Sequence, residues 1–407
     1  MENFQTAKRE YILRILSAAT FTIFFQLYMV APLIPGFSAY FKVPEQTVGL
    51  IVPAYLIPYG IATLFYGLLS DIIGPKRIIL TSLFAFSILT ALTAFSTSVN
   101  QLIFWRFITG IGASGVVPIA LAWIGQTYAF EERGRPLGWL FGAMAGGGAF
   151  GSSVGVMLEP FIGWKMLFIG VAVTGFFIWI ILYLVYLRVK TSTVTKPVLT
   201  WSIVFNGYKQ LLSSGRGKTA YVFVLLNAVF HAGVFTWLGL YFEKTFGLNG
   251  IQIGLAILGY GIPGFLLGPF IGKLADKFGR KKLLPLGLGL SALSAFILIF
   301  NIPLGLAAFA VTILSLGYDL TQPLLAGIIT QVGKERSGQA MSLNVFMLFI
   351  GFGLGSYLFG LALKLSLMQA FIIFSVFQTG LSLLAITLFN TEIRTSSLSK
   401  EAVSVSH

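Results

Sequence analysis

Three ionisable side chains lie inside long apolar stretches of this sequence, namely Asp319, Arg106 and His231. On insertion scales a charged side chain at the centre of a membrane helix costs about 2.5–3.5 kcal/mol, so such groups normally face a cavity or a partner. A carboxylate buried without a partner tends to take up a proton, and an imidazole titrates near neutral pH. We therefore predict that Asp319 and His231 bind and release protons.

A purely structural role is the alternative for each of these residues. Asp319 would then be a permanently paired carboxylate, and His231 a neutral ring held by a hydrogen bond. Arg106 lies near the outer end of its stretch, so its side chain could extend toward the membrane surface instead of facing a cavity. For each of the three residues the sequence leaves the functional and the structural role open.

Other kinds of site chemistry receive no support from the residues. The chain has no Cys and only two His, far apart, so thiolate chemistry and a His-based zinc site are not expected. The phosphate-binding motif G-x-x-x-x-G-K-[ST] does not occur, which argues against ATP-driven pumping. We predict no metal, no cofactor and no enzymatic activity.

The composition indicates that lipid surrounds most of the chain. Of the 407 residues, 57% are apolar and 10% are charged, and the mean hydropathy is +0.89. A water-exposed surface needs far more charge than this. The net charge of +14 is spread over short gaps between apolar stretches instead of forming a basic face, so nucleic-acid binding is not expected.

A membrane helix needs roughly 20 mostly apolar residues, and twelve stretches of the sequence approach or exceed this length. They are residues 12–33, 47–69, 77–97, 102–124, 138–158, 166–187, 219–240, 252–272, 284–301, 305–327, 339–363 and 369–389. The predicted fold class is therefore an all-α membrane protein with twelve transmembrane helices. Because twelve is an even number, both termini are expected on the same side of the membrane.

The distribution of Lys and Arg predicts the orientation. Lys42, Lys165, Lys244 and Lys364 fall on one side and Arg106 within a span, which leaves 22 of the 27 basic residues on the side of the termini. Basic residues concentrate in cytoplasmic loops. We therefore expect a multi-pass protein of the cytoplasmic (inner) membrane with both termini in the cytoplasm.

The two halves of the chain resemble each other at an offset of 205 residues. The matched positions are Gly49, Tyr55 and Pro58 with Gly254, Tyr260 and Pro263; Gly67, Asp71 and Gly74 with Gly272, Asp276 and Gly279; and Gly112, Pro118 and Gln126 with Gly317, Pro323 and Gln331. Two similar six-helix bundles can rock against each other around a central site. The repeat therefore predicts two pseudo-symmetric bundles and transport by alternating access.

The predicted organisation has four parts. They are an N-terminal six-helix bundle of residues 1–187, a cytoplasmic linker of residues 188–218, a C-terminal six-helix bundle of residues 219–390 and a Ser-rich cytoplasmic tail of residues 391–407. Aromatic residues at helical spacing in the linker, such as Trp201 and Tyr208, predict a short amphipathic helix on the membrane surface. A mobile linker is the alternative.

The loops after the second and eighth spans carry the same motif. The first reads Gly67-Leu-Leu-Ser-Asp71-Ile-Ile-Gly74-Pro-Lys76-Arg77, and the second reads Gly272-Lys-Leu-Ala-Asp276-Lys-Phe-Gly279-Arg280. Both resemble the signature loop of the major facilitator superfamily, and the resemblance extends over about residues 10–390. It implies that these residues gate the conformational change by holding the cytoplasmic side closed in the outward-facing state. Pro75 stands where the family has an Arg, and Lys76 and Arg77 are the candidates to replace that Arg.

Arg106 begins a further motif. The stretch Arg106-Phe-Ile-Thr-Gly110-Ile-Gly112 resembles the R-x-x-q-G-x-g motif of the same family, with Thr109 where Gln is usual. The resemblance implies that Arg106 takes part in proton transfer.

Glycines recur at every fourth position in spans five and eight, at Gly147, Gly151 and Gly155 and at Gly264 and Gly268. This spacing lets membrane helices approach closely. The first run also resembles the glycine motif of drug–proton antiporters, although Ser152 replaces its Pro. Helix packing alone explains these glycines equally well.

In this family the first and seventh spans line the central cavity. The resemblance therefore implies that the substrate contacts Gln26, Tyr28, Asn227, His231 and Trp237. Such a cavity is aromatic and weakly polar, which favours an amphipathic neutral or anionic substrate over a strongly cationic one.

The predicted function is proton-coupled efflux of small amphipathic organic molecules, as in the twelve-helix drug–proton antiporters. A proton-symport importer or an uncoupled facilitator of a small metabolite is the alternative. The expected partners are a small-molecule substrate, protons and membrane lipids, and the protein is expected to be a monomer.

Overall fold

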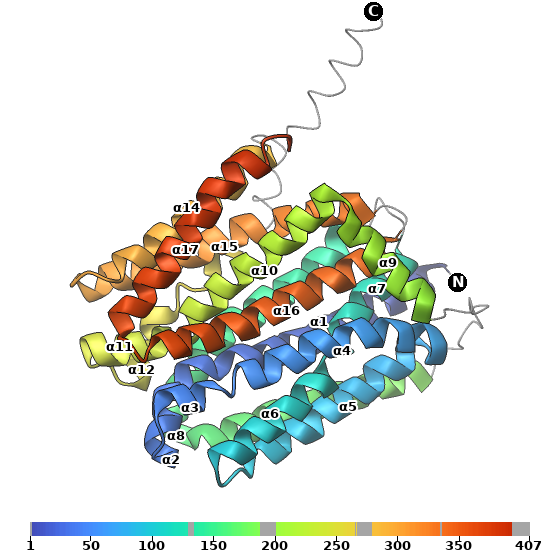
Figure 1. Cartoon of the computed structure of the whole chain (residues 1–407). Coiled ribbons are helices and arrows are strands. Elements are labelled where there is room, and N and C mark those ends of the chain that lie inside the picture. Colours follow the sequence, from blue (N-terminus) through green and yellow to red (C-terminus); the bar gives the residue numbers. More distant parts are fainter. Residues whose placement is uncertain are drawn as a thin grey trace, which may run out of the picture.

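The structure is a computed structural model that describes residues 2–128, 134–187, 201–264, 266, 279–333 and 336–392. Within these ranges every regular element is helical. Figure 1 shows the long helices running side by side, with early helices such as α4 and α5 on one side and late helices such as α14 and α17 on the other.

Eight α-helices and one 3₁₀ helix make up the N-terminal part of the chain. They are α1 (Glu2–Met29), η1 (Ala31–Leu33), α2 (Ile34–Phe41), α3 (Glu45–Gly49), α4 (Pro53–Ile73), α5 (Pro75–Ala94), α6 (Val99–Ala113), α7 (Val117–Thr127) and α8 (Gly134–Leu187). The 54-residue α8 turns at Gly163, whose φ of 74° lies in the left-handed region that glycine adopts without strain. This turn separates the fifth predicted span from the sixth.

The C-terminal part repeats this arrangement after a linker helix. Its elements are α9 (Trp201–Ser213), α10 (Gly215–Thr236), α11 (Leu238–Phe246), α12 (Gly250–Ile257), α14 (Arg280–Ile297), α15 (Leu304–Gly333), α16 (Ser337–Ala362) and α17 (Leu367–Leu388). We call the end of the molecule where α17 finishes the near end, and the opposite end, which holds Phe41 and Phe246, the far end.

Nine helical segments within the described ranges are long and apolar enough to cross a membrane. One of them, Arg135–Leu187, contains two predicted spans. The segment Gly250–Gly264 is the described beginning of the eighth predicted span, and α14 is the ninth, with three basic residues in its first turn. The helices therefore match the twelve predicted spans.

Several spans are interrupted near the far end, and the apolar patterns of the sequence did not predict these breaks. The first span passes from α1 through η1 into α2, at Pro32, which has no N–H for the helical hydrogen-bond pattern. The seventh span is broken at Trp237, between α10 and α11. The two interruptions pack together, because a Cβ added to Gly239 would lie 2.9 Å from Pro32 Cα.

Glycine contacts join α8 to α1 within the N-terminal bundle. A Cβ added to Gly147 would lie 2.6 Å from Phe21 O, and one added to Gly151 would lie 2.4 Å from Phe25 O. Gly155 has the same relation to Met29 Cβ, at 2.7 Å. These three glycines therefore let the two helix backbones approach closely.

Two helix pairs bring the bundles together, α4 with α16 and α8 with α12. The linker helix α9 packs against α10 and α16. A Cβ added to Gly207 of α9 would contact the Gln339 side chain of α16. The predicted linker helix is thus present over Trp201–Ser213 and docks on the C-terminal bundle, while residues 188–200 lie outside the described ranges.

Candidate transport site

A small cavity lies between the two bundles. The N-terminal half contributes Leu27, Tyr28, Ala31, Val52 and Leu56, and the C-terminal half contributes His231, Ala232, Phe235, Thr236 and Phe352. Its free volume of about 20 Å³ is room for about one water molecule by this measure. The cavity is therefore nearly filled by its own side chains, and most of these are apolar.

Tyr28 and His231 face each other across this cavity and are connected through Tyr260. The Tyr28 ring lies 6.3 Å from the Tyr260 ring, centroid to centroid. The Tyr260 hydroxyl is hydrogen-bonded to His231 Nε2. Tyr28 belongs to the N-terminal bundle and the other two residues to the C-terminal bundle. This chain of contacts therefore crosses from one bundle to the other.

Aromatic rings hold His231 in place. Its ring stacks on Tyr318 with a centroid separation of 3.6 Å, and Phe352 lies 5.8 Å away by the same measure. The imidazole is buried, at 3% exposure. Tyr260, Tyr318 and Phe352 were not predicted as site residues, and the adjacency of Tyr318 to Asp319 is the sequence signal that points to it.

Asp319 lies beside this aromatic cluster. Its carboxylate is close enough to Tyr28, Tyr260 and Tyr318 to interact with their phenols electrostatically. Its Oδ2 accepts a hydrogen bond from Ser315 Oγ at 3.1 Å. No ion pair within the described ranges includes Asp319. In the part of the chain described here, its partners are thus neutral groups.

Arg106 is fully buried in the N-terminal bundle, so its side chain does not reach the membrane surface. Nη1 donates to Gln26 Oε1 at 2.8 Å, and Nε donates to Ile51 O at 3.3 Å. The guanidinium lies 4.1 Å from the centroid of the Tyr55 ring, a cation–π contact. Nη2 has no hydrogen-bond partner among the described residues. Gln26 is therefore occupied by Arg106 and does not line the cavity.

The offset of 205 residues relates the two polar clusters. Gln26 corresponds to His231, and Tyr55 corresponds to Tyr260. The charged residues break the symmetry, because position 311, which corresponds to Arg106, is Val, and position 114, which corresponds to Asp319, is Ser. Arg106 in the N-terminal bundle and Asp319 in the C-terminal bundle thus have no charged counterpart at the equivalent position of the other bundle.

Asn227 and Trp237 have structural partners away from the cavity lining. Asn227 Nδ2 donates to Thr321 Oγ1 at 2.9 Å, and its Oδ1 accepts from Gln378 Nε2 at 2.9 Å. These bonds join α10 to α15 and α17. Trp237 Nε1 donates to Ser356 O at 3.1 Å.

The bundles touch at the far end. The Trp237 ring fills a space between two glycines, since a Cβ would lie 2.4 Å from the ring at Gly49 and 2.8 Å from it at Gly360. Lys244 Nζ forms an ion pair with Glu45 Oε1 at 2.9 Å, between the C-terminal and N-terminal bundles. The cavity is therefore closed toward the far end.

The predicted gating residues that the structure describes lie at the near end. Gly74, with a φ of 94°, forms the turn from α4 to α5, and Lys76 Nζ donates to Tyr186 O at the end of α8. Arg77 is exposed. Gly67 lies on α4 opposite α16, where an added Cβ would be 3.9 Å from Ser342 Oγ. Gly268, Gly272 and Asp276 lie outside the described residues, and so does the side chain of Asp71.

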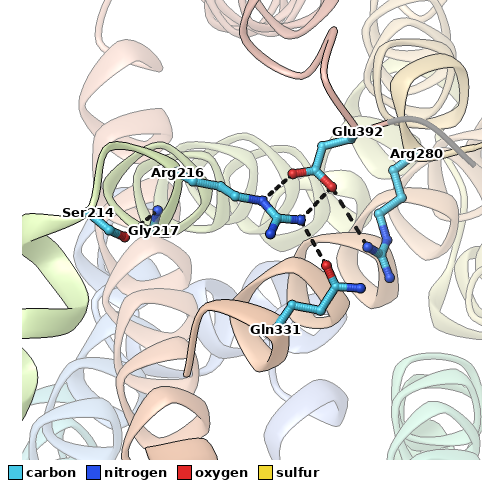
Figure 2. Close-up of polar contacts among 6 residues, drawn as sticks. All are labelled: Ser214, Arg216, Gly217, Arg280, Gln331 and Glu392. Atoms are coloured by element: carbon cyan, nitrogen blue, oxygen red, sulfur yellow. Dashed lines mark hydrogen bonds and ion pairs between the residues drawn. The ribbon is translucent and has the colours of Figure 1, made fainter. Parts of the chain in front are cut away.

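Figure 2 shows the equivalent region of the C-terminal bundle, where Glu392 accepts from Arg216. Arg216 Nη2 also donates to Gln331 Oε1 at 2.8 Å, and Arg280 Nη1 lies 3.8 Å from Glu392 Oε2. Gly279, with a φ of 76°, precedes Arg280. Glu392 is 7% exposed, although the sequence placed it in the tail of residues 391–407.

Comparisons with known proteins identify the family. The model of the Major Facilitator Superfamily matches residues 16–257 and 240–405. An uncharacterized MFS-type transporter, YceJ, of Bacillus subtilis is 26% identical over 378 residues, which cover 92% of this chain and 94% of that protein. Multidrug resistance protein 2 of Bacillus subtilis is 24% identical over 368 residues, covering 88% and 90%.

Solved structures show the same fold. A bacterial homologue of the human lysosomal transporter Spinster, in an inward-facing and unoccupied conformation, superposes with a TM-score of 0.78 at 16% identity and covers 95% of this chain and 98% of its own. The nucleoside transporter NupG gives a TM-score of 0.73 at 14% identity, covering 93% and 99%. The predicted fold of two six-helix bundles is confirmed. This chain is an integral membrane protein that belongs to the Major Facilitator Superfamily, and it is a secondary transporter of small molecules, not an enzyme.

Proposed function

We propose that the protein exports small amphipathic organic molecules in exchange for protons by alternating access. The observation that carries this proposal is Asp319, a carboxylate at mid-span with only neutral partners among the described residues. A carboxylate without a counter-charge in an apolar region readily takes up a proton. Because Asp319 lies beside Tyr28 and Tyr260, whose rings meet between the bundles, its protonation state can affect their contact.

Arg106 and His231 have different parts in this proposal. Arg106 keeps its charge inside the N-terminal bundle, held by Gln26 and Tyr55, and shapes the electrostatic field around the proton path. His231 lines the cavity and connects it to Asp319 through Tyr318. Substrate would contact Tyr28 and His231 once the cavity widens.

The cavity lining supports the choice of substrate class. Phe235 and Phe352 give it aromatic surface, while Tyr28, His231 and Thr236 bring polar atoms. Such a surface suits molecules that combine apolar rings with a few hydrogen-bonding groups. The similarity to a multidrug resistance protein over most of both chains points to the same class.

Orientation and assembly follow the distribution of charge. We place the near end, with both termini, in the cytoplasm and the far end outside the inner membrane, because basic residues concentrate at the near end. The gating loops then face the cytoplasm, where Lys76 and Arg280 tie them to the ends of α8 and α17. The bundles of residues 1–187 and 219–390 form one monomeric unit in contact with lipid.

A second candidate is uptake or uncoupled movement of a small metabolite. A putative niacin/nicotinamide transporter of Bacillus subtilis is 32% identical over 123 residues, which cover 30% of this chain. This short match favours an aromatic metabolite as cargo and does not distinguish import from export.

Flux through proteoliposomes separates these functions. Chloramphenicol serves as a neutral probe, fluorescein as an anionic probe and ethidium as a cationic probe, each under a pH gradient of either sign. We expect chloramphenicol or fluorescein to move against the proton gradient, by up to about tenfold accumulation per pH unit for one-to-one exchange with the membrane potential clamped at zero. Asp319→Asn should abolish this dependence while binding of the probe persists.

Three results would contradict the proposal. Flux in the same direction as the proton gradient would indicate symport. Flux that does not depend on the pH gradient would show that Asp319 is not a proton-coupling site. Flux that still depends on the gradient in Asp319→Asn would show the same.

A further inference from the structure

The eighth span is interrupted where it meets the N-terminal bundle. Helix α12 ends at Ile257, residues 258–261 form turns, and the chain is helical again at Ile262. Gly261 has a φ of 79°, and a Cβ added to it would lie 2.7 Å from Ala149 Cβ on α8. The interruption therefore needs glycine for its conformation and for its contact with the opposite bundle.

Two hydrogen bonds connect this interruption to Asp319. The backbone N–H of Gly261 donates to Ser315 Oγ at 2.9 Å. The hydroxyl of Ser315 donates in turn to Asp319 Oδ2 at 3.1 Å. The Ser315 hydroxyl thus connects the backbone of the interruption to the carboxylate, because it accepts from Gly261 and donates to Asp319.

Gly264 supplies another connection. Its backbone lies directly against the Asp319 carboxylate. A Cβ at this position would lie 2.7 Å from Oδ1 and 2.8 Å from Oδ2. Gly264 was predicted to serve helix packing, and the neighbour that it faces on α15 is the Asp319 carboxylate. Only glycine leaves the space that Asp319 occupies.

Protonation must change this set of bonds. An ionised carboxylate only accepts hydrogen bonds, whereas a protonated one has an oxygen that donates. A proton on either oxygen removes the negative charge beside the Gly264 backbone, and a proton on Oδ2 also turns the Ser315 hydroxyl away. Either way, the residues on both sides of Gly261 lose a restraint.

The interruption also carries Tyr260, which reaches the opposite bundle through Tyr28. In the described part of the chain, the titratable groups that face Asp319 are Tyr28 from α1, Tyr260 from the interruption and Tyr318 from its own helix, with His231 of α10 behind Tyr318. All of them are neutral hydrogen-bonding groups or stacked rings when Asp319 is charged. A change in the charge of Asp319 therefore acts on the hydrogen bonds that connect it to the interruption.

We propose that Ser315 and Gly264 are positioning residues that link the protonation of Asp319 to the interruption at Gly261, and through it to the contact between the bundles. This inference rests on the proposed proton coupling. The N-terminal bundle cannot contain such a link, because the positions equivalent to Ser315 and Asp319 are Gly110 and Ser114. The link therefore belongs to one half of the molecule only.

The absence of Cys from the chain allows a direct test. Spin labels at Asn100→Cys and Lys364→Cys, exposed positions at the far end of each bundle, report the separation of the bundles as a function of pH. The matched control for Ser315→Ala is Ser291→Ala, which removes another buried serine that packs against α15 without touching Asp319. Ser315→Thr keeps the hydroxyl and should restore the wild-type response.

We expect the label distance of the wild type to change with pH and that of Asp319→Asn to remain constant. In Ser315→Ala the midpoint should move upward by about one pH unit, because the carboxylate loses one hydrogen bond. Ser315→Thr and Ser291→Ala should keep the wild-type midpoint. Chloramphenicol affinity, measured at a fixed pH above the midpoint, should stay within about twofold of the wild type in the three serine variants, as they leave the cavity lining intact.

The outcomes distinguish this inference from the proposed function. A wild type without a pH response, or a response that persists in Asp319→Asn, would overturn proton coupling itself. Loss of the response in Asp319→Asn together with an unchanged midpoint in Ser315→Ala would overturn the role of Ser315 alone. If Ser315→Ala does not fold, Gly264→Ala provides the second variant. It must displace the carboxylate, and a midpoint equal to that of the wild type would refute the link.

Discussion

The contact of Trp237 with Gly49 gives a quantitative prediction for the conformational equilibrium. Gly49 belongs to the N-terminal bundle, and a Cβ there would lie 2.4 Å from Cη2 and 2.6 Å from Cζ2 of the indole. The ring cannot retreat, because Gly360 lies against it and Ser356 O holds its N–H. Gly49→Ala should therefore push the bundles apart at the far end.

The size of the effect follows from the cost of overpacking. Inserting a methyl group into a filled, buried space typically costs about 1–3 kcal/mol. In this protein the cost applies only to the conformation in which the far end is closed, since Trp237 and Gly49 separate when it opens. The equilibrium should thus shift about 5- to 150-fold toward the open far end.

Labelling of a single cysteine measures this shift. Ala31 lines the cavity and is 3% exposed, so Ala31→Cys reacts with a membrane-impermeant maleimide from the far end only after the bundles part. In the orientation proposed above, with the far end outside, intact cells or right-side-out vesicles suffice. We expect Gly49→Ala to raise the labelling rate about 5- to 150-fold.

A neighbouring glycine provides the control. Gly36 on α2 lies toward the same end, and a Cβ added there meets no atom within 4 Å. Gly36→Ala should label like the parent chain. Equal rates in Gly49→Ala and Gly36→Ala would refute the view that Trp237 closes the far end between two glycines.

Further predictions concern the other polar contacts. Gln26→Leu leaves Arg106 without its side-chain acceptor and should lower the free energy of unfolding by about 1–3 kcal/mol, and an unchanged unfolding temperature in detergent would argue against this bond. Glu392→Gln weakens the pair with Arg216, which is 47% exposed, so we expect a loss of about 1 kcal/mol or less that shrinks in high salt. Insensitivity to salt would show that the pair adds no charge-based stability. Asp71→Ala should slow transport without a large change in substrate affinity, and a wild-type rate would exclude the gating role.

Much of the fold could be predicted from the sequence because a membrane span is recognised by the average hydropathy of roughly 20 consecutive residues. A stretch such as residues 339–363 is apolar over its whole length, and α16 occupies Ser337–Ala362. The interruptions depend instead on single contacts. Nothing in the local sequence around Trp237 indicates a break between α10 and α11. The break places the indole between Gly49 and Gly360, and these glycines lie far from Trp237 in the sequence.

The candidate site shows the same division. Asp319, Arg106 and His231 stand out because charge is rare in apolar stretches, and Tyr28 and His231 do line the cavity. The partners of these residues could not be predicted, because they come from other helices. The bond between Gln26 and Arg106 joins residues 80 positions apart in the sequence, and no local pattern indicates it. Glu392 likewise looks like part of a polar tail until Arg216 is seen beside it.

The duplicated architecture explains why the charges of Arg106 and Asp319, each within a span, differ in kind. Both halves place a polar group at equivalent positions, Gln26 and His231, next to a tyrosine. In the N-terminal bundle the added charge is Arg106, held by hydrogen bonds and by the Tyr55 ring, and a guanidinium does not lose its proton in proteins. In the C-terminal bundle the added charge is Asp319, beside an interrupted helix that touches the other bundle. A permanent charge can be sealed within one bundle, whereas the proton coupling proposed here requires a titratable group that touches the contact between the bundles. The carboxylate satisfies that requirement and the guanidinium does not.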